Sequence, residues 1–320
     1  MCEAVSGRDL DWFFNQWVFN PGAPLYSYGW RNVSAGGRNY VELYLNQTQN
    51  AAWPTFDMPL DVGTTAGTGN ASRTVRNNAR TQHLLWEVPG AISSLTLDPN
   101  NWVLTASNTS PAYGKTAATF VEGPPKIVDV QPAPGSSSAA SVVRVTFHRP
   151  VNSSAGQYTL TRSGSPVAFT HAYNAGAQRA DLTLTPPIMP GTYVLTVGAG
   201  VTGQTGGLAL DGEAANPVSP ASLPTGDGVP GGAATFRFTI PSCSAADLAT
   251  EGGGLLSGPD GFVTGVDFDV FIQAFFSETR DPFGTLLADL TDAVGTGSPD
   301  GLLTGSDFDR FIVQFFTGCP

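Results

Sequence analysis

The chain has 320 residues, 38 glycines, 25 prolines and only 13% charged residues, with a net charge of −11 at neutral pH. This length is typical of two or three domains, and the composition favours many short strands joined by turns. Nucleic acid is not expected as a partner because no basic patch is present to neutralise phosphates. No run of 18 apolar residues suggests a membrane span.

The first 24 residues are predicted to contain one apolar helix. Residues 6–18 follow a helical pattern that begins at Ser6 and ends before Pro21-Gly22. Its apolar face is too large for a helix with nothing ahead of it to pack on, so we expect it to belong to a larger helical domain. That face comprises Leu10, Phe13, Phe14, Trp17 and Val18. Met1-Cys2-Glu3 begins no signal peptide, which favours the downstream part of a longer secreted precursor over a cytosolic chain.

A first β-sandwich is predicted over residues 25–108. Its seven strand-like stretches alternate apolar and polar residues and are separated by turns. They are residues 25–30, 40–47, 55–62, 73–76, 83–88, 92–97 and 102–106.

Residues 1–108 resemble the end of the catalytic domain of an M1-family (gluzincin) aminopeptidase and the β-sandwich that follows it. The motifs that carry the resemblance are Asp9-Leu10 to Trp17, Pro21-Gly22-Ala23-Pro24, Met58-Pro59-Leu60-Asp61-Val62 and Leu97-Asp98-Pro99-Asn100-Asn101-Trp102-Val103-Leu104. The resemblance implies that residues 1–24 are the closing helix of a catalytic domain.

The chain itself is expected to contain no catalytic residue and no zinc site. The M1 family holds zinc with His-Glu-x-x-His and a further Glu, whereas this chain has only His83, His148 and His171. None of the three has a second His at helical spacing, so each is predicted to be an ordinary strand residue. No Gly-x-Ser-x-Gly nucleophile elbow appears either.

Residues 109–124 are predicted to be a linker, and residues 125–241 a second β-sandwich. Seven strand-like stretches are expected there, at residues 126–130, 142–147, 157–161, 167–171, 180–184, 192–197 and 235–240. With Pro125-Lys126-Ile127-Val128-Asp129-Val130 and Pro190-Gly191-Thr192-Tyr193-Val194-Leu195-Thr196-Val197, this part resembles a bacterial Ig-like domain of the surface-layer type. Residues 210–213 and 225–228 are either an ion-holding loop or solvated turns.

Residues 242–320 contain an internal repeat. Residues 246–250 return as 288–292, and residues 259–267 return as 299–307. Each copy is followed by a predicted helix with one apolar stripe, and neither stripe can be buried alone, so we expect the two helices to pair. The stripes are Phe268, Phe271, Ile272, Phe275 and Phe276 in the first copy, and Phe308, Phe311, Ile312, Phe315 and Phe316 in the second.

The turn before each helix, Asp-Gly-x-(Val/Leu)-Thr-Gly-x-Asp, reproduces positions 5 to 12 of a calcium-binding loop. The expected ligands of two Ca²⁺ ions are side chains and one backbone carbonyl in each copy. They are Asp247, Asp260, Phe262 (carbonyl), Thr264 and Asp267, and then Asp289, Asp300, Leu302 (carbonyl), Thr304 and Asp307. Val263 and Leu303 should enter the core. Positions 1 and 3 lack ligands, so Asp247 and Asp289 would reach in from a longer loop. The alternative is that Asp267 and Asp307 only cap their helices.

The tail, which opens with Cys243 and closes with Gly318-Cys319, resembles a dockerin of the kind found at the C-terminus of planctomycete-type secreted proteins. The resemblance implies a duplicated calcium-loop-plus-helix fold that attaches its host to a protein partner or a cell surface. The placement of Cys243 and Cys319 around the repeat suggests a disulfide and an oxidising compartment, with Cys2 left free. The alternative is two free thiols.

Taken together, the sequence predicts a mainly β chain of two consecutive sandwiches, the second Ig-like, followed by a small helical module. The expected function is support and calcium-dependent anchoring in a secreted or cell-surface protein. One alternative is part of an active zinc aminopeptidase whose catalytic residues lie upstream or on another chain. The other is a free-standing adhesion or matrix protein.

Overall fold

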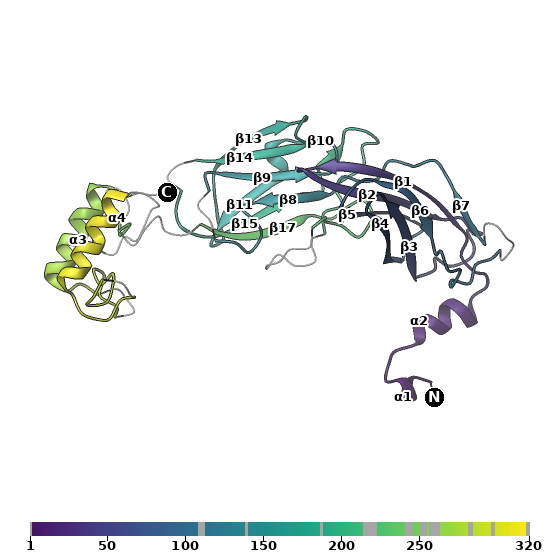
Figure 1. Cartoon of the computed structure of the whole chain (residues 1–320), viewed down its shortest axis with the longest axis horizontal. Helices are drawn as coiled ribbons and strands as arrows, with labels where there is room; N and C mark the ends of the chain where they lie inside the picture. Colours follow the sequence, from purple (N-terminus) through teal and green to yellow (C-terminus); the bar gives the residue numbers. More distant parts are fainter. Residues whose placement is uncertain are drawn as a thin grey trace.

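The structure, a computed structural model, describes residues 2–107, 113–137, 140–185, 188–213, 223–240, 246–249, 255, 263–280, 284–295 and 298–317. The chain is mainly β, as predicted. Two β-units lie next to each other along the long axis, with a pair of helices at one end and two short N-terminal helical segments at the other (Figure 1). Within the described residues, no helix is long and apolar enough to cross a membrane.

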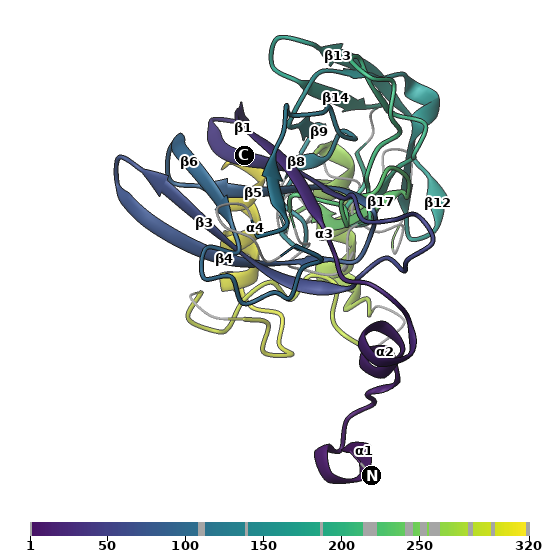
Figure 2. The ribbon, with the colours of Figure 1, turned by 90° about the vertical axis from the view of Figure 1, so that its right-hand side faces the viewer.

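The N-terminal segment forms two separate pieces rather than the single predicted helix. α1 spans Cys2–Ser6, and α2 spans Asp11–Phe14 and continues as a π-helical turn, η1, over Asn15–Phe19. Ser6 therefore ends a helix instead of beginning one, because Gly7 adopts a left-handed φ of 64° that terminates α1. α1 extends away from the β-units in the two views (Figures 1 and 2), whereas η1 contacts the first β-unit, where the side-chain oxygen of Gln16 accepts from the N–H of Asp57 at 2.7 Å.

The apolar face of α2 and η1 is largely exposed. Phe13 is 42% exposed and Val18 is 59% exposed. Trp17 is held against the ring of Phe56 at a centroid distance of 5.2 Å. As the sequence indicated, this face is larger than the described residues can cover.

The first β-unit contains two sheets around one core. β1 (Tyr26–Ala35), β2 (Arg38–Gln47), β5 (Thr81–Val88) and β7 (Lys115–Ala117) form a sheet in the order β5-β2-β1-β7. β3 (Met58–Ala66), β4 (Gly69–Asn77) and β6 (Ile92–Leu97) form the other, in the order β4-β3-β6. Alternate residues of β2 and β3, one strand from each sheet, face inward and are fully buried, so the arrangement is β-sandwich-like. Examples are Val41, Leu43, Leu45, Leu60 and Val62.

Six of the seven strands predicted here are confirmed, but residues 102–106 form no strand. Asp98 turns the chain at this point, since its carboxylate accepts hydrogen bonds from the backbone N–H groups of Trp102 (3.0 Å) and Val103 (3.2 Å). The strand that completes the sheet is instead β7, which lies inside the predicted linker and pairs in parallel with β1. Lys115 at its start donates to the carbonyl oxygen of Asp98 at 2.7 Å.

The second β-unit is also β-sandwich-like, and all seven of its predicted strands are present. One sheet contains β8 (Ile127–Gln131), β9 (Val142–Phe147), β13 (Phe169–Asn174) and β14 (Arg179–Leu184). The other contains β11 (Tyr158–Arg162), β12 (Ser165–Pro166), β15 (Gly191–Val197) and β17 (Ala234–Ile240). A short pair, β10 (Val151–Asn152) and β16 (Thr202–Gly203), lies beside them. The core between the sheets includes Val143, Val145, Leu195 and Phe236.

A buried network of charges joins the two β-units. Glu42 of β2 is fully buried and forms ion pairs with Arg149 and with Arg31, the latter at 2.9 Å. Arg149, 5% exposed, also pairs with Glu122 of the connecting segment, and Arg31 reaches the same carboxylate at 2.5 Å. Two cations and two carboxylates thus balance one another, which is what makes such a burial tolerable.

The same network fixes the ionisation of Glu42. Burial disfavours its charged form, but the hydrogen bond with His148 and the guanidinium groups of Arg149 and Arg31 outweigh burial and hold its pKa at about 2. The nearby imidazole of His83 is buried, and desolvation lowers its pKa to about 4. His83 is therefore neutral at physiological pH, beside a carboxylate that is ionised.

The connecting segment passes over His83 so closely that only glycine fits. A Cβ added to Gly123 would overlap Cγ and Nδ1 of the His83 ring. We expect Gly123→Ala to lower the free energy of unfolding by about 1 to 3 kcal/mol, because the connecting segment must shift from the joint. Urea unfolding followed by tryptophan fluorescence measures this. Gly90→Ala is the matched control, since a Cβ at Gly90 meets nothing within 4 Å; equal effects of the two changes would contradict the close packing.

Candidate functional site: the C-terminal helix pair

The two repeat copies form one paired module, as the sequence predicted. α3 spans Gly265–Ser277 and α4 spans Gly305–Thr317. At the centre of the pair, the rings of Phe271 and Phe311 stack with centroids 4.0 Å apart and an interplanar angle of 9°. Both rings are fully buried.

The buried stripe is narrower than predicted. Phe276 is 78% exposed and its repeat counterpart Phe316 is 79% exposed, although both were expected in the stripe. Eight residues of helix advance by about 800°, which turns Phe276 and Phe316 roughly 80° away from Phe268 and Phe308 at the start of each stripe. The other stripe members face the partner helix or the core around it, as do Val263 and Leu303.

The third residue of each helix is an aspartate, and its carboxylate accepts hydrogen bonds at the first helical turn. Asp267 accepts hydrogen bonds at Oδ2 from the backbone N–H (2.7 Å) and the hydroxyl (3.1 Å) of Thr264, the residue before the helix. The Thr264 hydroxyl oxygen in turn accepts from the N–H of Val266 at 3.3 Å. This is the capping-box arrangement, and it satisfies backbone donors that the first helical turn leaves unpaired.

The second oxygen of the same carboxylate holds a segment far back in the sequence. Oδ1 of Asp267 accepts from the N–H groups of Leu248 (2.7 Å) and Ala249 (2.8 Å). With four donors on its two oxygens and no exposed surface, Asp267 joins α3 to the start of its own repeat copy. We call this arrangement of one carboxylate and four donors the carboxylate clamp.

The second copy repeats the carboxylate clamp bond for bond. Oδ2 of Asp307 accepts from the N–H (2.8 Å) and hydroxyl (3.0 Å) of Thr304, and Oδ1 accepts from the N–H groups of Leu290 (2.9 Å) and Thr291 (3.0 Å). Asp307 is likewise fully buried. Leu290 and Thr291 occupy the repeat positions of Leu248 and Ala249. Asp267 and Asp307 thus cap their helices, and each also makes a long-range tie that the sequence did not indicate.

The remaining expected ligands of the second copy lie around one turn. Asp289, 4% exposed, accepts from the N–H groups of Asp300 (3.2 Å) and Gly301 (2.6 Å), so it does reach this loop from upstream. Asp300 accepts from the N–H groups of Ala293 and Leu302, both at 3.0 Å. Gly301 has a φ of 86°, the left-handed conformation that glycine permits at a sharp bend.

The fit of these residues to calcium is partial. Asp289 and Asp300 belong to one loop, whereas Asp307 does not fit as a ligand in this arrangement because its oxygens already receive four donors. In the first copy Asp247 is buried, but Asp260 and Phe262 lie outside the described residues. Calcium binding therefore stays a prediction.

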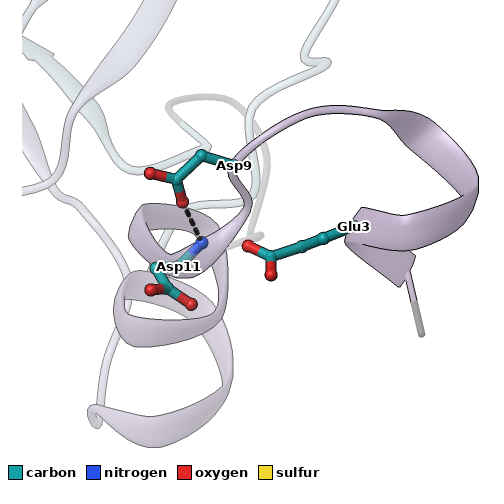
Figure 3. A group of neighbouring side chains, drawn as sticks. All are labelled: Glu3, Asp9 and Asp11. Atoms are coloured by element: carbon teal, nitrogen blue, oxygen red, sulfur yellow. Dashed lines mark hydrogen bonds between the residues drawn. The ribbon is translucent and has the colours of Figure 1, made fainter.

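Two other groups of three carboxylates come within 4.8 Å of one another in the described part of the chain. Glu3, Asp9 and Asp11 lie around the start of α2 (Figure 3). There, Glu3 accepts from the N–H of Leu10 at 2.8 Å and Asp9 from the N–H of Asp11 at 3.0 Å. All three are exposed, and two of them serve to order the turn before the helix.

The other group, Asp211, Glu213 and Asp227, occupies the loops considered above as an ion site. Its buried member, Asp211, pairs with the ammonium group of Lys126, which is 2% exposed. Asp211 also accepts from the N–H groups of Asp227 (3.0 Å) and Gly228 (2.9 Å). The ammonium group of Lys126 thus supplies positive charge in these loops, where the sequence allowed either a bound ion or solvated turns.

His83 and His148 both lie near Glu42 at the joint between the β-units, and His171 lies elsewhere in the second β-unit. His83 is in β5, where its ring is 5.1 Å from that of Tyr44. His148 follows β9, and its Nδ1 accepts from the N–H of Lys126 at 3.0 Å. His171 is in β13, with Nε2 2.9 Å from the hydroxyl of Ser153. His83 and His171 are strand residues as predicted, whereas His148 lies one residue beyond its strand.

Cys2 is exposed and is a free thiol. Cys243 and Cys319, the predicted disulfide, lie outside the described residues.

Comparisons with known proteins add little to this description. No family model matches the chain, and no curated protein matches it. Among solved structures, it is similar to PcoC, a methionine-rich copper resistance protein from Escherichia coli, with 16% identity, a TM-score of 0.23, and coverage of 36% of this chain and 97% of that one. It is also similar to the titin domains Z1Z2 in complex with telethonin, with 11% identity, a TM-score of 0.19, and coverage of 68% and 80%.

Proposed function

We propose that this chain is a non-catalytic supporting and tethering region of a secreted or cell-surface protein. In this proposal its helix pair is a dockerin-type anchor, and its β-units are an M1-like and a bacterial Ig-like sandwich. The observation that carries it is the duplicated carboxylate clamp, in which Asp267 and Asp307 make the same bonds in both copies. Two matched halves around one Phe271–Phe311 contact form a self-contained module, which is what an attachment unit needs.

The anchor is expected to contact its partner through two exposed phenylalanines, one at each end of the antiparallel helix pair. Phe276 and Phe316 are repeat counterparts at the ends of α3 and α4, and both are more than three-quarters exposed. Aromatic side chains, phenylalanine among them, are enriched at protein interfaces relative to the rest of the surface. Retention of the chain by the cell envelope, with and without these two side chains, tests the proposal.

The β-units support the role of a spacer. Their joint is made by balanced buried ion pairs rather than by a flexible tether, because Arg149 contacts Glu42 of the first unit and Glu122 of the connecting segment. A joint of this kind holds the two units in one orientation. The helix pair is thereby carried at a distance from the N-terminal segment (Figure 1).

The rival proposal is an active zinc aminopeptidase whose catalytic residues lie upstream or on another chain. It predicts hydrolysis of aminoacyl chromogenic amides only when such a catalytic part is supplied. Hydrolysis by the purified 320-residue chain, lost with a chelator, would overturn the non-catalytic proposal. Attachment to a matrix by the β-units alone would instead favour the free-standing adhesion protein.

The anchor proposal also includes a dependence on calcium. In the second copy, Asp289 and Asp300 would be the first ligands, and binding through Asp307 would require displacement of its backbone donors. We therefore expect weak affinity, with a dissociation constant of about 10⁻⁴ to 10⁻³ M. Calorimetry of the full chain should show this heat, and Asp289→Asn with Asp300→Asn should remove it. No heat at about 10 mM calcium would reject calcium binding and leave the helix pair held by its apolar core and the carboxylate clamps.

A further inference from the structure

A cleft of about 610 Å³ lies where the open edges of the first β-unit meet the second. β4 and β5 are the edge strands of the two sheets on this side, and both line the cleft. Residues 223, 224, 226 and 227 of the second β-unit also line it. The cleft is within the size range of ligand sites in proteins, and neither the support role nor the anchor uses it.

Among the described residues, the backbone of β5 has hydrogen-bonding groups on the cleft side for which no partner is present. Gln47 of β2 donates to the carbonyl oxygen of Arg80 at 2.7 Å, so even-numbered residues of β5 direct their backbone groups toward β2. Odd-numbered residues therefore direct theirs outward. His83 follows this rule, since its N–H donates to the carbonyl oxygen of Gly228 at 2.7 Å.

Beyond this bond, the outward N–H and C=O groups of Leu85 and Glu87 face the cleft. The loop at Gly228 thus already pairs with β5 at one residue, and the cleft continues along the next four residues of the strand. An exposed row of backbone donors and acceptors is the template on which an extended chain adds as a further strand.

The charges around the cleft favour an acidic occupant. Its lining carries Arg73, Arg76 and Lys126 against Glu87 and Asp227, in a chain whose net charge is −11. Several of these charges are already paired within the chain. Lys126 pairs with Asp211, Arg76 with Asp57 at 2.5 Å, and Glu87 with Arg38 at 3.3 Å.

Arg73 is the cation in the lining that is left for a ligand. It is exposed, and among the described residues its recorded partner is the ring of Trp86, with the guanidinium carbon 5.8 Å from the centroid. A guanidinium on an aromatic face keeps its donors available for a carboxylate. Arg73 belongs to β4 and the outward backbone groups belong to β5, and both strands line the cleft.

We propose that this cleft binds an extended acidic peptide segment, which adds to β5 through Leu85 and Glu87 and pairs a carboxylate with Arg73. The backbone of β5 supplies the affinity for an extended chain. Arg73 supplies the preference for acidic side chains. The site lies on the first β-unit and is independent of the helix pair.

The test uses the full chain and three labelled octapeptides in fluorescence polarisation. The first is acetylated and amidated (Thr-Glu)₄, the second is (Thr-Lys)₄, and the third is (Thr-Glu)₄ with every second amide N-methylated. We expect the first to bind at least about tenfold more tightly than the other two, because they lack the carboxylates or the backbone donors. Equal binding of all three peptides overturns the proposal.

Two variants test whether the peptide binds at Glu87 and Arg73. Glu87→Pro removes one outward N–H while leaving the pairing with β2 intact, since proline is tolerated on an edge strand. Its matched control is Glu87→Ala, which removes the same charge and keeps the N–H. Arg73→Gln, compared with Arg144→Gln in the second β-unit, tests the carboxylate contact.

We expect Glu87→Pro and Arg73→Gln each to weaken (Thr-Glu)₄ binding by about tenfold, and the two controls to leave it within about twofold. Loss of binding equal in each variant and its control contradicts the placement. A dimer of the chain that Glu87→Pro dissociates also overturns the proposal, because the edge would then pair with a second copy.

Discussion

Asp267→Asn is expected to weaken the attachment of α3 to the start of its repeat copy while leaving the β-units unchanged. An amide group can accept through its oxygen only, so the change leaves two of the four donors of the carboxylate clamp without an acceptor inside a buried site. Unpaired buried donors cost about 1 to 3 kcal/mol each, so we expect a loss of about 3 kcal/mol in the local stability of the helix pair. Hydrogen exchange of the amides of residues 265–277 should accelerate by about a hundredfold.

The chain contains its own matched control for this change. Asp269→Asn removes the same charge from the same helix, but Asp269 is exposed. We expect its effect on exchange to be less than about twofold, as for surface substitutions generally. Asp307→Asn should reproduce the large effect in the second copy. Equal exchange in the Asp267 and Asp269 variants would show that the carboxylate clamp does not hold the helix.

Arg149→Met is expected to loosen the joint between the β-units. Its removal leaves the fully buried carboxylate of Glu42 with one arginine in place of two, and breaking a buried ion pair by removing one partner costs about 3 to 5 kcal/mol. Urea unfolding followed by tryptophan fluorescence reports on the first β-unit and the N-terminal segment, because all six tryptophans lie before residue 103.

Arg38→Met serves as the control for lost charge. Arg38 pairs with Glu87 at 3.3 Å, and both side chains are about half exposed, so the change should cost less than about 1 kcal/mol. The double variant Glu42→Gln with Arg149→Met should recover part of the loss, because no unbalanced charge remains at the joint. A purely additive double variant would mean that the two groups do not depend on each other.

Local pattern predicted most of the fold. Alternation of apolar residues located thirteen of the fourteen expected strands, since strand periodicity depends on neighbours within the same segment. The exception is residues 102–106, which form no strand because the carboxylate of Asp98 accepts hydrogen bonds from the following N–H groups and turns the chain. The prediction of one N-terminal helix was wrong because the helix ends at Gly7. The apolar pattern does not reveal the left-handed conformation of this residue.

The candidate site was predictable only in part. The repeat indicated two paired helices and marked Asp267 and Asp307 as residues with a special role. Their second set of partners, the N–H groups of Leu248 and Leu290 and of the residues after them, lies 16 to 19 residues upstream. The repeated Ala-Asp-Leu was the available signal, but backbone donors carry no side-chain pattern. The outward backbone groups on the edge of β5 could not be predicted either, because which strand lies at an edge depends on strand order rather than on residue type.

The measurement that tests the account most directly is retention of the chain by the cell envelope of the organism that makes it. The wild-type chain and a variant carrying Phe276→Ser and Phe316→Ser are compared in envelope and medium fractions, with Trp102→Ser, also exposed, as a control outside the anchor. We expect the wild type and the Trp102 variant in the envelope fraction and the double variant in the medium, with exchange in α3 and α4 unchanged. Retention of the double variant at the wild-type level would contradict tethering through the helix pair.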